Sequence, residues 1–130
     1  MQPLARVVAS ASTRSIHRSW ESRFAIPKAP ERPGLTPQDI DVWEVHEAYA
    51  SVAVAILREL PKQLDGFRVP DEKLNPNGGR CRHRSSVRLL GHAVRAHARD
   101  RAGERRARYG VLGVCVGSGQ GVAPVLEHAA

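Results

Sequence analysis

Among the residues whose types could do chemistry, Cys115 comes first, because it stands between the apolar run Val111–Val116 and a glycine-rich turn. A short run of small and β-branched residues bounded by glycine is typical of an interior strand. Gly117, Gly119 and Gly121 follow at alternate positions, and glycine lets the backbone approach other backbone or a substrate where a Cβ would clash. The thiol is therefore either a packed small hydrophobe or a reactive group that faces a cleft.

The cysteine count argues against two other kinds of chemistry. Cys81 and Cys115 are the two cysteines among the 130 residues, and they give neither a disulfide framework nor a metal-ligand pair at useful spacing. We expect no bound metal. Because disulfide-free proteins are typical of reducing compartments, we expect a cytoplasmic location.

The second candidate is His46, at the start of a helix that we predict over residues 46–60. Val52 and Ile56 share one face of this helix, and most of its remaining surface is apolar as well. Such a helix is expected to be largely buried, and Pro61 is expected to end it. A histidine in a first helical turn is either a partly exposed residue or a catalytic one.

Four strands are expected around this helix. Residues 4–11 are small and apolar, and residues 40–45 alternate apolar and polar side chains, which is typical of a half-buried strand. Residues 109–116 form the strand that carries Cys115. Residues 122–126 follow so closely that we expect them to return as a hairpin.

Two further helices are expected, and one region shows no clear period. Thr36 is a candidate N-cap for a short helix at residues 35–40, with Pro37 at its first position. Residues 89–102 have helical spacing, whereas residues 13–33 contain three prolines and receive no assigned element. The order of elements predicts an α/β fold with helices layered on a mixed β-sheet.

The net charge of +7 comes from one segment. Ten arginines and no lysine lie between Arg80 and Arg108, with Asp100 and Glu104 as the acids there, and the other residues sum to −1. Aromatic residues that could stack on bases are nearly absent, so a platform for single-stranded nucleic acid is unsupported. No apolar run is long enough to span a bilayer. We expect neither a nucleic acid nor a membrane as partner.

Three separated stretches together resemble the C-terminal half of the thiolases, enzymes that make or cleave β-ketoacyl-CoA thioesters. Residues 3–8 resemble the strand that opens this half. Residues 43–50 resemble the segment with the family's N/H-E-A-F/Y-A motif, and residues 115–121 resemble its C-x-G-x-G-x-G motif. The resemblance implies one thiolase-like C-terminal domain over residues 1–130, which is incomplete as a thiolase.

The resemblance also implies roles for four residues. Cys115 would be the acid/base cysteine, which removes a proton α to a thioester carbonyl in condensation and returns it in cleavage. His46, more often asparagine in the family, would orient a water that stabilises charge on the thioester oxygen. Gly117 and Gly119 would bind substrate by bringing backbone close to the reacting centre. The implied substrate is an acyl-CoA thioester without a further cofactor, and the family-typical assembly is a homo-oligomer.

The family's G-H-P-x-G stretch, whose histidine activates the nucleophilic cysteine, does not follow the Asn75–Gly79 turn. Arg80–Arg88 stands in its place, and neither His83 nor His92 takes over its role. Codons chosen for Arg80–Arg88 and read one base later spell Gly-Ala-Val-Thr-Gly-His-Pro-Phe-Gly. We therefore hypothesise a frameshift there. Residues 80–88 and 14–33 both match the family poorly, and we expect them to be disordered or encoded out of frame.

The family's acyl-accepting cysteine belongs to an N-terminal half that this sequence does not include, and Cys81 is no substitute. We expect a fragment of an acyl-CoA acyltransferase that is inactive alone, with a separately encoded N-terminal half as its partner. One alternative is a degenerate, non-catalytic fragment of the thiolase-like or lipid-carrier type. A third reading, a small basic nucleic-acid-binding protein, is supported only by Arg80–Arg108.

Overall fold

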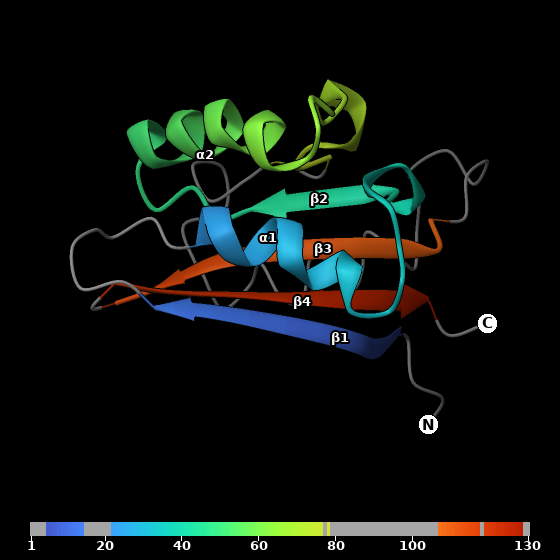
Figure 1. Cartoon of the computed structure of the whole chain (residues 1–130). Coiled ribbons are helices and arrows are strands. Elements are labelled where there is room, and N and C mark those ends of the chain that lie inside the picture. The colour runs from blue at the N-terminus through green and yellow to red at the C-terminus, as the bar shows by residue number, and fades with distance from the viewer. Residues whose placement is uncertain (1–4, 15–21, 77, 79–106, 118, 129–130) are drawn as a thin grey trace.

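The computed structural model describes residues 5–14, 22–76, 78, 107–117 and 119–128 (Figure 1). The described part alternates strands and helices and then ends in two consecutive strands. In chain order the elements are β1 (Ala5–Arg14), α1 (Ser22–Glu31), the 3-10 helix η1 (Pro37–Asp39), β2 (Val42–Val45), α2 (Ala50–Gln63), the 3-10 helix η2 (Asp71–Lys73), β3 (Tyr109–Val116) and β4 (Gln120–His128).

The four strands of the described part form one mixed sheet in the order β1-β4-β3-β2. β4 pairs antiparallel with β1 and with β3, whereas β2 pairs parallel with β3. The predicted hairpin between the last two strands is confirmed, and Gly119 takes a positive φ of 72° in its turn. Because β2 and β3 run in the same direction, their carboxyl ends meet at one edge of the sheet (Figure 1).

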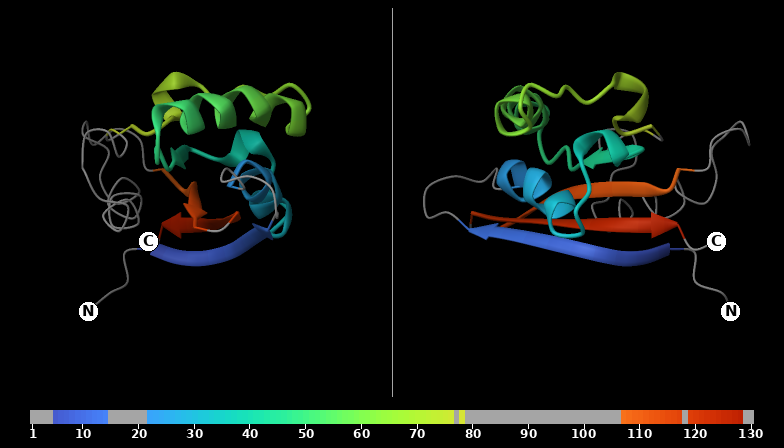
Figure 2. Two further views of the ribbon diagram at one scale, coloured as in Figure 1. Left: turned by 90° about the vertical axis from the view of Figure 1, so that its left-hand side faces the viewer. Right: turned by 45° about the vertical axis from the view of Figure 1, so that its right-hand side comes forward.

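Both helices cover the same face of the sheet, with α1 over β1, β4 and β3 and α2 beyond it on the side of β2 (Figures 1 and 2). The apolar core lies between the helices and this face. Its buried members include Ala25, Ile26 and Ala29 of α1, Val52, Ile56 and Leu60 of α2, and Ala11, Trp43, Val45, Val111, Ala123 and Val125 of the sheet. This layered arrangement is the α/β fold that the sequence predicts.

The opposite face of the sheet also carries buried side chains. Gly113 contacts Ile26 of α1, and side chains alternate along a strand, so Leu112 lies on the other face. Glu44 is in register with Leu112 and lies on that same face. Both are buried, with exposed fractions of 0% for Leu112 and 2% for Glu44.

The helix α1 lies where the sequence indicated no element. It contains Pro27 and Pro30, each of which removes a backbone donor and costs helix stability. Ala25, Ile26 and Ala29 are almost completely buried, so packing against the sheet outweighs the low helix propensity. Of the two poorly matching stretches, residues 22–31 thus form a buried helix, whereas residues 15–21 and 80–88 lie outside the described residues.

The helix α2 differs from the prediction at both ends and in burial. It begins at Ala50 instead of His46, and it continues past Pro61 to Gln63. Pro61 costs the helix one backbone donor, and burial of the neighbouring Leu60 in the core outweighs that cost. One face is buried, but Val54 on another face is 48% exposed, so the expectation of a largely buried helix is corrected.

The predicted strand at residues 40–45 is shorter and more deeply buried than expected. β2 comprises Val42–Val45, and all four residues are buried instead of every second one. Trp43 packs against the ring of Phe67, with 5.9 Å between ring centroids, and forms an isolated parallel bridge with Leu74. Phe67 and Leu74, in the segment that follows α2, thus pack against β2.

The short helix before β2 is confirmed as η1, and Thr36 caps it as predicted. The side-chain oxygen Oδ2 of Asp39 accepts hydrogen bonds from the backbone N–H of Thr36 at 2.7 Å and from its hydroxyl at 2.6 Å. Thr36 donates both bonds, and they hold the turn through which the chain enters β2. The predicted helix at residues 89–102 lies outside the described residues.

Candidate active site

Cys115 lies near the carboxyl end of β3, in register with Gly121 of β4. Its side chain is half-buried, and it is a free cysteine. It lies two residues after Gly113, so its side chain is on the face that α1 covers. There the Sγ atom of Cys115 is 3.0 Å from the hydroxyl of Ser22, the first residue of α1. The thiol is therefore held on one side by Ser22 and is only partly exposed.

The contact between α1 and β3 depends on the absence of a side chain at Gly113. A Cβ built there would lie 2.2 Å from Cδ1 and 2.5 Å from Cγ1 of Ile26, which is closer than real atoms approach. Ser22 precedes Ile26 by one helical turn, and Cys115 follows Gly113 by one strand repeat. Close packing of Ile26 on Gly113 thus brings Ser22 within hydrogen-bond distance of Cys115.

His46 lies directly after β2, at the edge where β2 and β3 end. Its backbone N–H donates to the carbonyl of Gly113 at 2.9 Å, and its own carbonyl accepts from the N–H of Ala48 at 2.9 Å. Its side chain is 5% exposed. The structure therefore places His46 in the segment between β2 and α2, one strand away from Cys115, and not in the first turn of a helix.

The end of β2 is held by Asn75, which the sequence indicated only as part of a turn. The amide oxygen of Asn75 accepts from the N–H of Val45 at 2.8 Å, and its amide nitrogen donates to the carbonyl of Val45 at 3.2 Å. The same nitrogen donates to Oε1 of Glu47 at 3.2 Å, and the backbone N–H of Asn75 donates to the carbonyl of Trp43 at 2.8 Å. Asn75 thereby fixes the residues on either side of His46.

Asn75 adopts a positive φ of 43°, a region that asparagine enters more readily than most residues. The readiness of asparagine to adopt this conformation, and its backbone-like amide, are the signal that sequence reasoning could have used. Asparagine before a proline and glycines, however, indicates a turn equally well. The positioning function of Asn75 is therefore visible only once β2 is placed beside it.

Glu44 places an acidic group on β2, two residues before His46. Neither carboxylate oxygen of Glu44 has a hydrogen-bond partner in the described part of the chain. Burial, together with the smaller effect of the negative charge of Glu47, raises the pKa of Glu44 to about 7. Near neutral pH this carboxyl group therefore exchanges between its neutral and charged forms.

The two glycines predicted to bind substrate have different surroundings. No protein atom lies within 4 Å of a Cβ built at Gly117, which is exposed in the turn after β3. Gly119 has the positive φ of the hairpin turn, so another residue there would be strained. The backbone conformation at position 119 thus requires glycine, whereas packing at position 117 would also allow a larger residue. Their contact with substrate stays a prediction.

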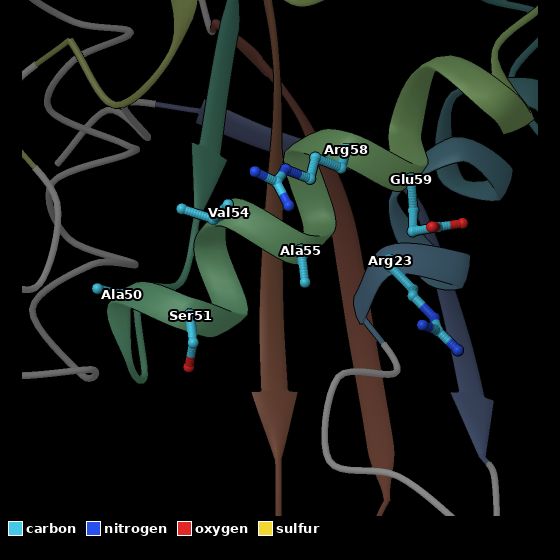
Figure 3. A pocket seen from close by; sticks show the side chains of 7 residues that line it. All are labelled: Arg23, Ala50, Ser51, Val54, Ala55, Arg58 and Glu59. Carbon is cyan, nitrogen blue, oxygen red and sulfur yellow. The ribbon is translucent and has the colours of Figure 1, made fainter.

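A surface pocket of about 540 Å³ lies between α2 and the start of α1. Figure 3 shows the side chain of Arg23 from α1 on one side and Ser51 and Val54 from α2 on the other. Neither Cys115 nor His46 lines it. This pocket is therefore distinct from the candidate site at the sheet edge.

Within the residues that the structure describes, no group of three or more histidine, cysteine and acidic side chains is placed to hold a metal ion. Nor does any helix in this part of the chain have the length and apolar character needed to cross a membrane. Cys81, His83 and His92, which the sequence analysis considered as substitutes for the family's cysteine and histidine, lie outside the described residues.

The fold and the site together define an α/β domain. In it, Cys115 lies on the β3–β4 hairpin, beside the end of the parallel strand β2. Residues 1–128 match the family model described as "Thiolase, C-terminal domain". The chain belongs to the thiolase family, as the motifs at His46 and Cys115 indicated.

Two curated relatives illustrate the match. The chain is 36% identical over 113 residues to peroxisomal 3-ketoacyl-CoA thiolase B of Mus musculus, covering 81% of this chain and 23% of the relative. It is 34% identical over 131 residues to the 3-oxoadipyl-CoA/3-oxo-5,6-dehydrosuberyl-CoA thiolase of Escherichia coli strain K12, covering 98% of this chain and 31% of the relative. The chain thus spans between about a quarter and a third of the length of these relatives.

A solved structure agrees with the sequence comparison. The crystal structure of the Bacillus anthracis acetyl-CoA acetyltransferase superposes with a TM-score of 0.69 at 26% identity. The match covers 99% of this chain and 32% of that enzyme. The described fold is therefore that of the C-terminal part of a thiolase.

Proposed function

We propose that this chain forms the acid/base half of the active site of an acyl-CoA acyltransferase of the thiolase type. The observation that carries the proposal is the position of Cys115. Its half-buried thiol lies at the sheet edge where β2 and β3 end, one strand from His46. The relatives' names supply the substrate class, a CoA thioester.

In the proposed reaction, the Cys115 thiolate accepts the proton from the carbon α to a thioester carbonyl. The electron pair of that C–H bond then forms the new carbon–carbon bond, and in cleavage the thiol returns the proton. His46 orients a water toward the thioester oxygen, where negative charge develops. Gly117 and Gly119 let the substrate approach the backbone of the turn. The proposal involves no metal or prosthetic group.

We expect the 130-residue chain to be inactive when it is tested alone. The acyl-accepting cysteine of the thiolase mechanism comes from a segment outside the matched part, and without it the acyl group has no covalent carrier. The partner in the proposal is therefore an N-terminal thiolase half, whether encoded separately or in the same gene. A homo-oligomer of such complete units is the assembly that the resemblance supports.

A chimera tests this function directly. Residues 1–130 replace the matching C-terminal part of the Bacillus anthracis acetyl-CoA acetyltransferase, and CoA-dependent cleavage of acetoacetyl-CoA is followed by absorbance. A second chimera carries Gly-Ala-Val-Thr-Gly-His-Pro-Phe-Gly in place of residues 80–88. We expect the first to be inactive and the second active, because only the second supplies the histidine of the missing motif.

Cys115→Ala in the active chimera is expected to lower the rate by at least about a hundredfold, the usual contribution of a positioned acid/base group. Ser10→Ala, an exposed position on β1, is the matched control and should keep the rate. Undiminished cleavage in the Cys115→Ala chimera would overturn the proposed role of the thiol.

The second candidate function is a degenerate, non-catalytic thiolase-like domain, and the replaced G-H-P motif favours it. The two candidates separate in the same experiment. If the chimera with the restored motif folds but does not cleave acetoacetyl-CoA, the non-catalytic reading replaces the enzymatic one.

We also propose a cytoplasmic location, with one structural argument. Cys115 is a free thiol in the described part of the chain, and free thiols are typical of reducing compartments. The relatives include peroxisomal and bacterial proteins. Fractionation of the producing cells, with the chain detected in an organelle or in the cytosol, decides between these locations.

A further inference from the structure

We propose that Asn75 is a positioning residue for the imidazole of His46, which it controls by holding the two residues on either side, Val45 and Glu47. The inference deepens the proposed function and rests on it for its catalytic meaning, because His46 orients a water only in that reaction. The proposed reaction itself gives neither Asn75 nor Glu47 a part.

The side-chain amide of Asn75 uses its oxygen and both of its N–H groups on the segment around His46. The oxygen accepts from the N–H of Val45 at 2.8 Å. The nitrogen has two N–H groups to donate, and it lies 3.2 Å from the carbonyl of Val45 and 3.2 Å from Oε1 of Glu47. We call these three hydrogen bonds the Asn75 clamp. They hold the chain immediately before and immediately after His46.

His46 itself adds a third fixed point. Its backbone N–H donates to the carbonyl of Gly113 on β3 at 2.9 Å, and its side chain is 5% exposed. With the backbone held on both sides, a side chain in so little space keeps a defined orientation. This matters for a group that orients a water, because a misplacement of about 1 Å can cost about a hundredfold in rate.

The clamp is itself anchored to β2. The backbone N–H of Asn75 donates to the carbonyl of Trp43 at 2.8 Å, and the carbonyl of Asn75 accepts from the N–H of Gly78 at 2.8 Å. Leu74 forms its isolated bridge with the same Trp43, which is completely buried. A non-glycine residue keeps a positive φ of 43° where its surroundings fix it. Asn75 thus passes the rigidity of β2 on to the segment that carries His46.

The clamp requires an amide, since a carboxylate of the same shape has no N–H to donate. An aspartate at position 75 would place its charge beside the carbonyl of Val45 and the carboxylate of Glu47. The negative charge of Glu47 already contributes to the raised pKa of Glu44. The surroundings therefore favour asparagine over aspartate at this position.

Asp41 makes a comparable set of hydrogen bonds at the opposite end of β2. Its Oδ2 accepts from the backbone N–H of Arg108 at 2.8 Å and from that of Tyr109 at 3.1 Å. These bonds hold the beginnings of β2 and β3 together, whereas His46 follows the end of β2. Asp41→Ala is therefore the matched control, because it removes similar bonds from the same two strands and leaves the clamp in place.

A double-mutant cycle in the chimera with the restored motif tests the proposal. Asn75→Gly removes the amide and keeps the positive φ without strain. We expect it to lower kcat about a hundredfold with an unchanged KM for acetoacetyl-CoA, whereas Asp41→Ala should change kcat by about twofold or less. In a His46→Ala background, Asn75→Gly should cost about twofold or less, because the group that it positions is gone. Equal losses of kcat in both backgrounds would overturn the proposal.

NMR spectroscopy of the 130-residue chain tests the clamp without any enzymatic activity. The ring signals of His46 are identified by their absence from the spectrum of His46→Asn. In Asn75→Gly these signals should move toward their positions in the denatured chain, whereas Asp41→Ala should leave them in place. Unmoved signals in a folded Asn75→Gly chain refute the inference. If the chimera with the restored motif is inactive, the proposed function falls, and this shift alone decides whether Asn75 positions His46.

Hydrogen exchange of the parent chain decides the question if Asn75→Gly does not fold. The N–H of Val45, which is bonded to the amide of Asn75, should exchange as slowly as the N–H of His46, which is bonded to Gly113. Exchange of the Val45 amide at the rate of the denatured chain would show that the clamp does not hold.

Discussion

The two faces of the sheet bury their side chains in different ways. On the face under the helices, the buried residues of the strands are apolar, as Trp43, Val45 and Val111 show. On the opposite face, Leu112 is equally buried but its neighbour in register is Glu44, an acid without a hydrogen-bond partner in the described part. The first face is organised for stability, whereas the second carries a polar group that costs stability.

The comparison shows where the fold tolerates an unfavourable residue. Glu44 lies two residues before His46, on the strand whose end forms the candidate site. Groups that cost stability are concentrated at functional sites, where the surrounding packing holds them in place. The helix-covered face supplies that packing. Four experiments, from the largest expected effect to the smallest, test this difference.

Ile26→Ala removes the side chain that joins α1 to the sheet at Gly113, and it should have the largest effect. Ile26 is almost completely buried, so its truncation is expected to lower the free energy of unfolding by about 2–5 kcal/mol. Urea denaturation followed by circular dichroism measures the loss. A loss below about 1 kcal/mol would mean that the helix-covered face is not the main source of stability.

Glu44→Gln tests the opposite face through pH. The pKa of Glu44 is about 7 in the folded chain and 4.5 in its ordinary state, so the folded chain holds this proton more tightly. The stability that it contributes is present in full below pH 4.5 and is lost as the pH rises toward 7, on the order of 3 kcal/mol in total.

The glutamine variant, which has no ionisable group there, should lack this pH-dependent loss. Unfolding free energies of both proteins between pH 4.5 and 8 give the comparison. Parallel curves for the two proteins would show that Glu44 is not held in its neutral form by the fold.

Gly113→Ala and Gly117→Ala form a matched pair of intermediate effect. A methyl group at Gly113 collides with Ile26, whereas at Gly117 it meets no protein atom within 4 Å. We expect Gly113→Ala to cost about 1–3 kcal/mol and Gly117→Ala to be close to neutral. Combining Gly113→Ala with Ile26→Val, which removes the colliding Cδ1, should restore part of the loss. Equal effects at the two glycines would contradict the close contact of α1 with β3.

Val54→Ala on α2 should have the smallest effect. Its side chain is 48% exposed at the surface pocket, so its removal is expected to change the free energy of unfolding by about 0.5 kcal/mol or less. Thermal unfolding of Val54→Ala beside Ile26→Ala gives the contrast in one experiment. A loss as large as that of Ile26→Ala would mean that Val54 is covered in solution, for example by a second chain.

The strands and the hairpin pairing of β3 with β4 could be predicted because their signals are local. The apolar run at residues 109–116, the glycine turn and the return at 122–126 specify a hairpin without reference to the rest of the chain. The α/β class followed from the order of elements. The helix α1 could not be predicted, because Pro27 and Pro30 argue against a helix and only the tertiary contacts of Ala25 and Ile26 decide for it.

The sequence supplied the candidate site as a list of residues and not as a set of contacts. Family motifs named Cys115 and His46, and the structure places both where β2 and β3 end, while their roles stay predictions. Ser22 and Asn75 were missed because each acts on a residue at least 30 positions away in the chain. No local sequence pattern predicts such long-range contacts. The parallel pairing of β2 with β3, which creates the shared edge, is likewise non-local.

The pairing of β1 with β4 has a consequence for the synthesis of this chain. Ala5 lies opposite His128 and Arg14 opposite Gln120, so the first strand finds its only neighbour in the described sheet in the last one. During translation β1 emerges early and stays without that partner until β4 has left the ribosome. Contacts of such long sequence separation form slowly, and an unpaired strand is open to association with other chains. Strand β1 is therefore the part of the described sheet that stays open to such association until β4 has been made.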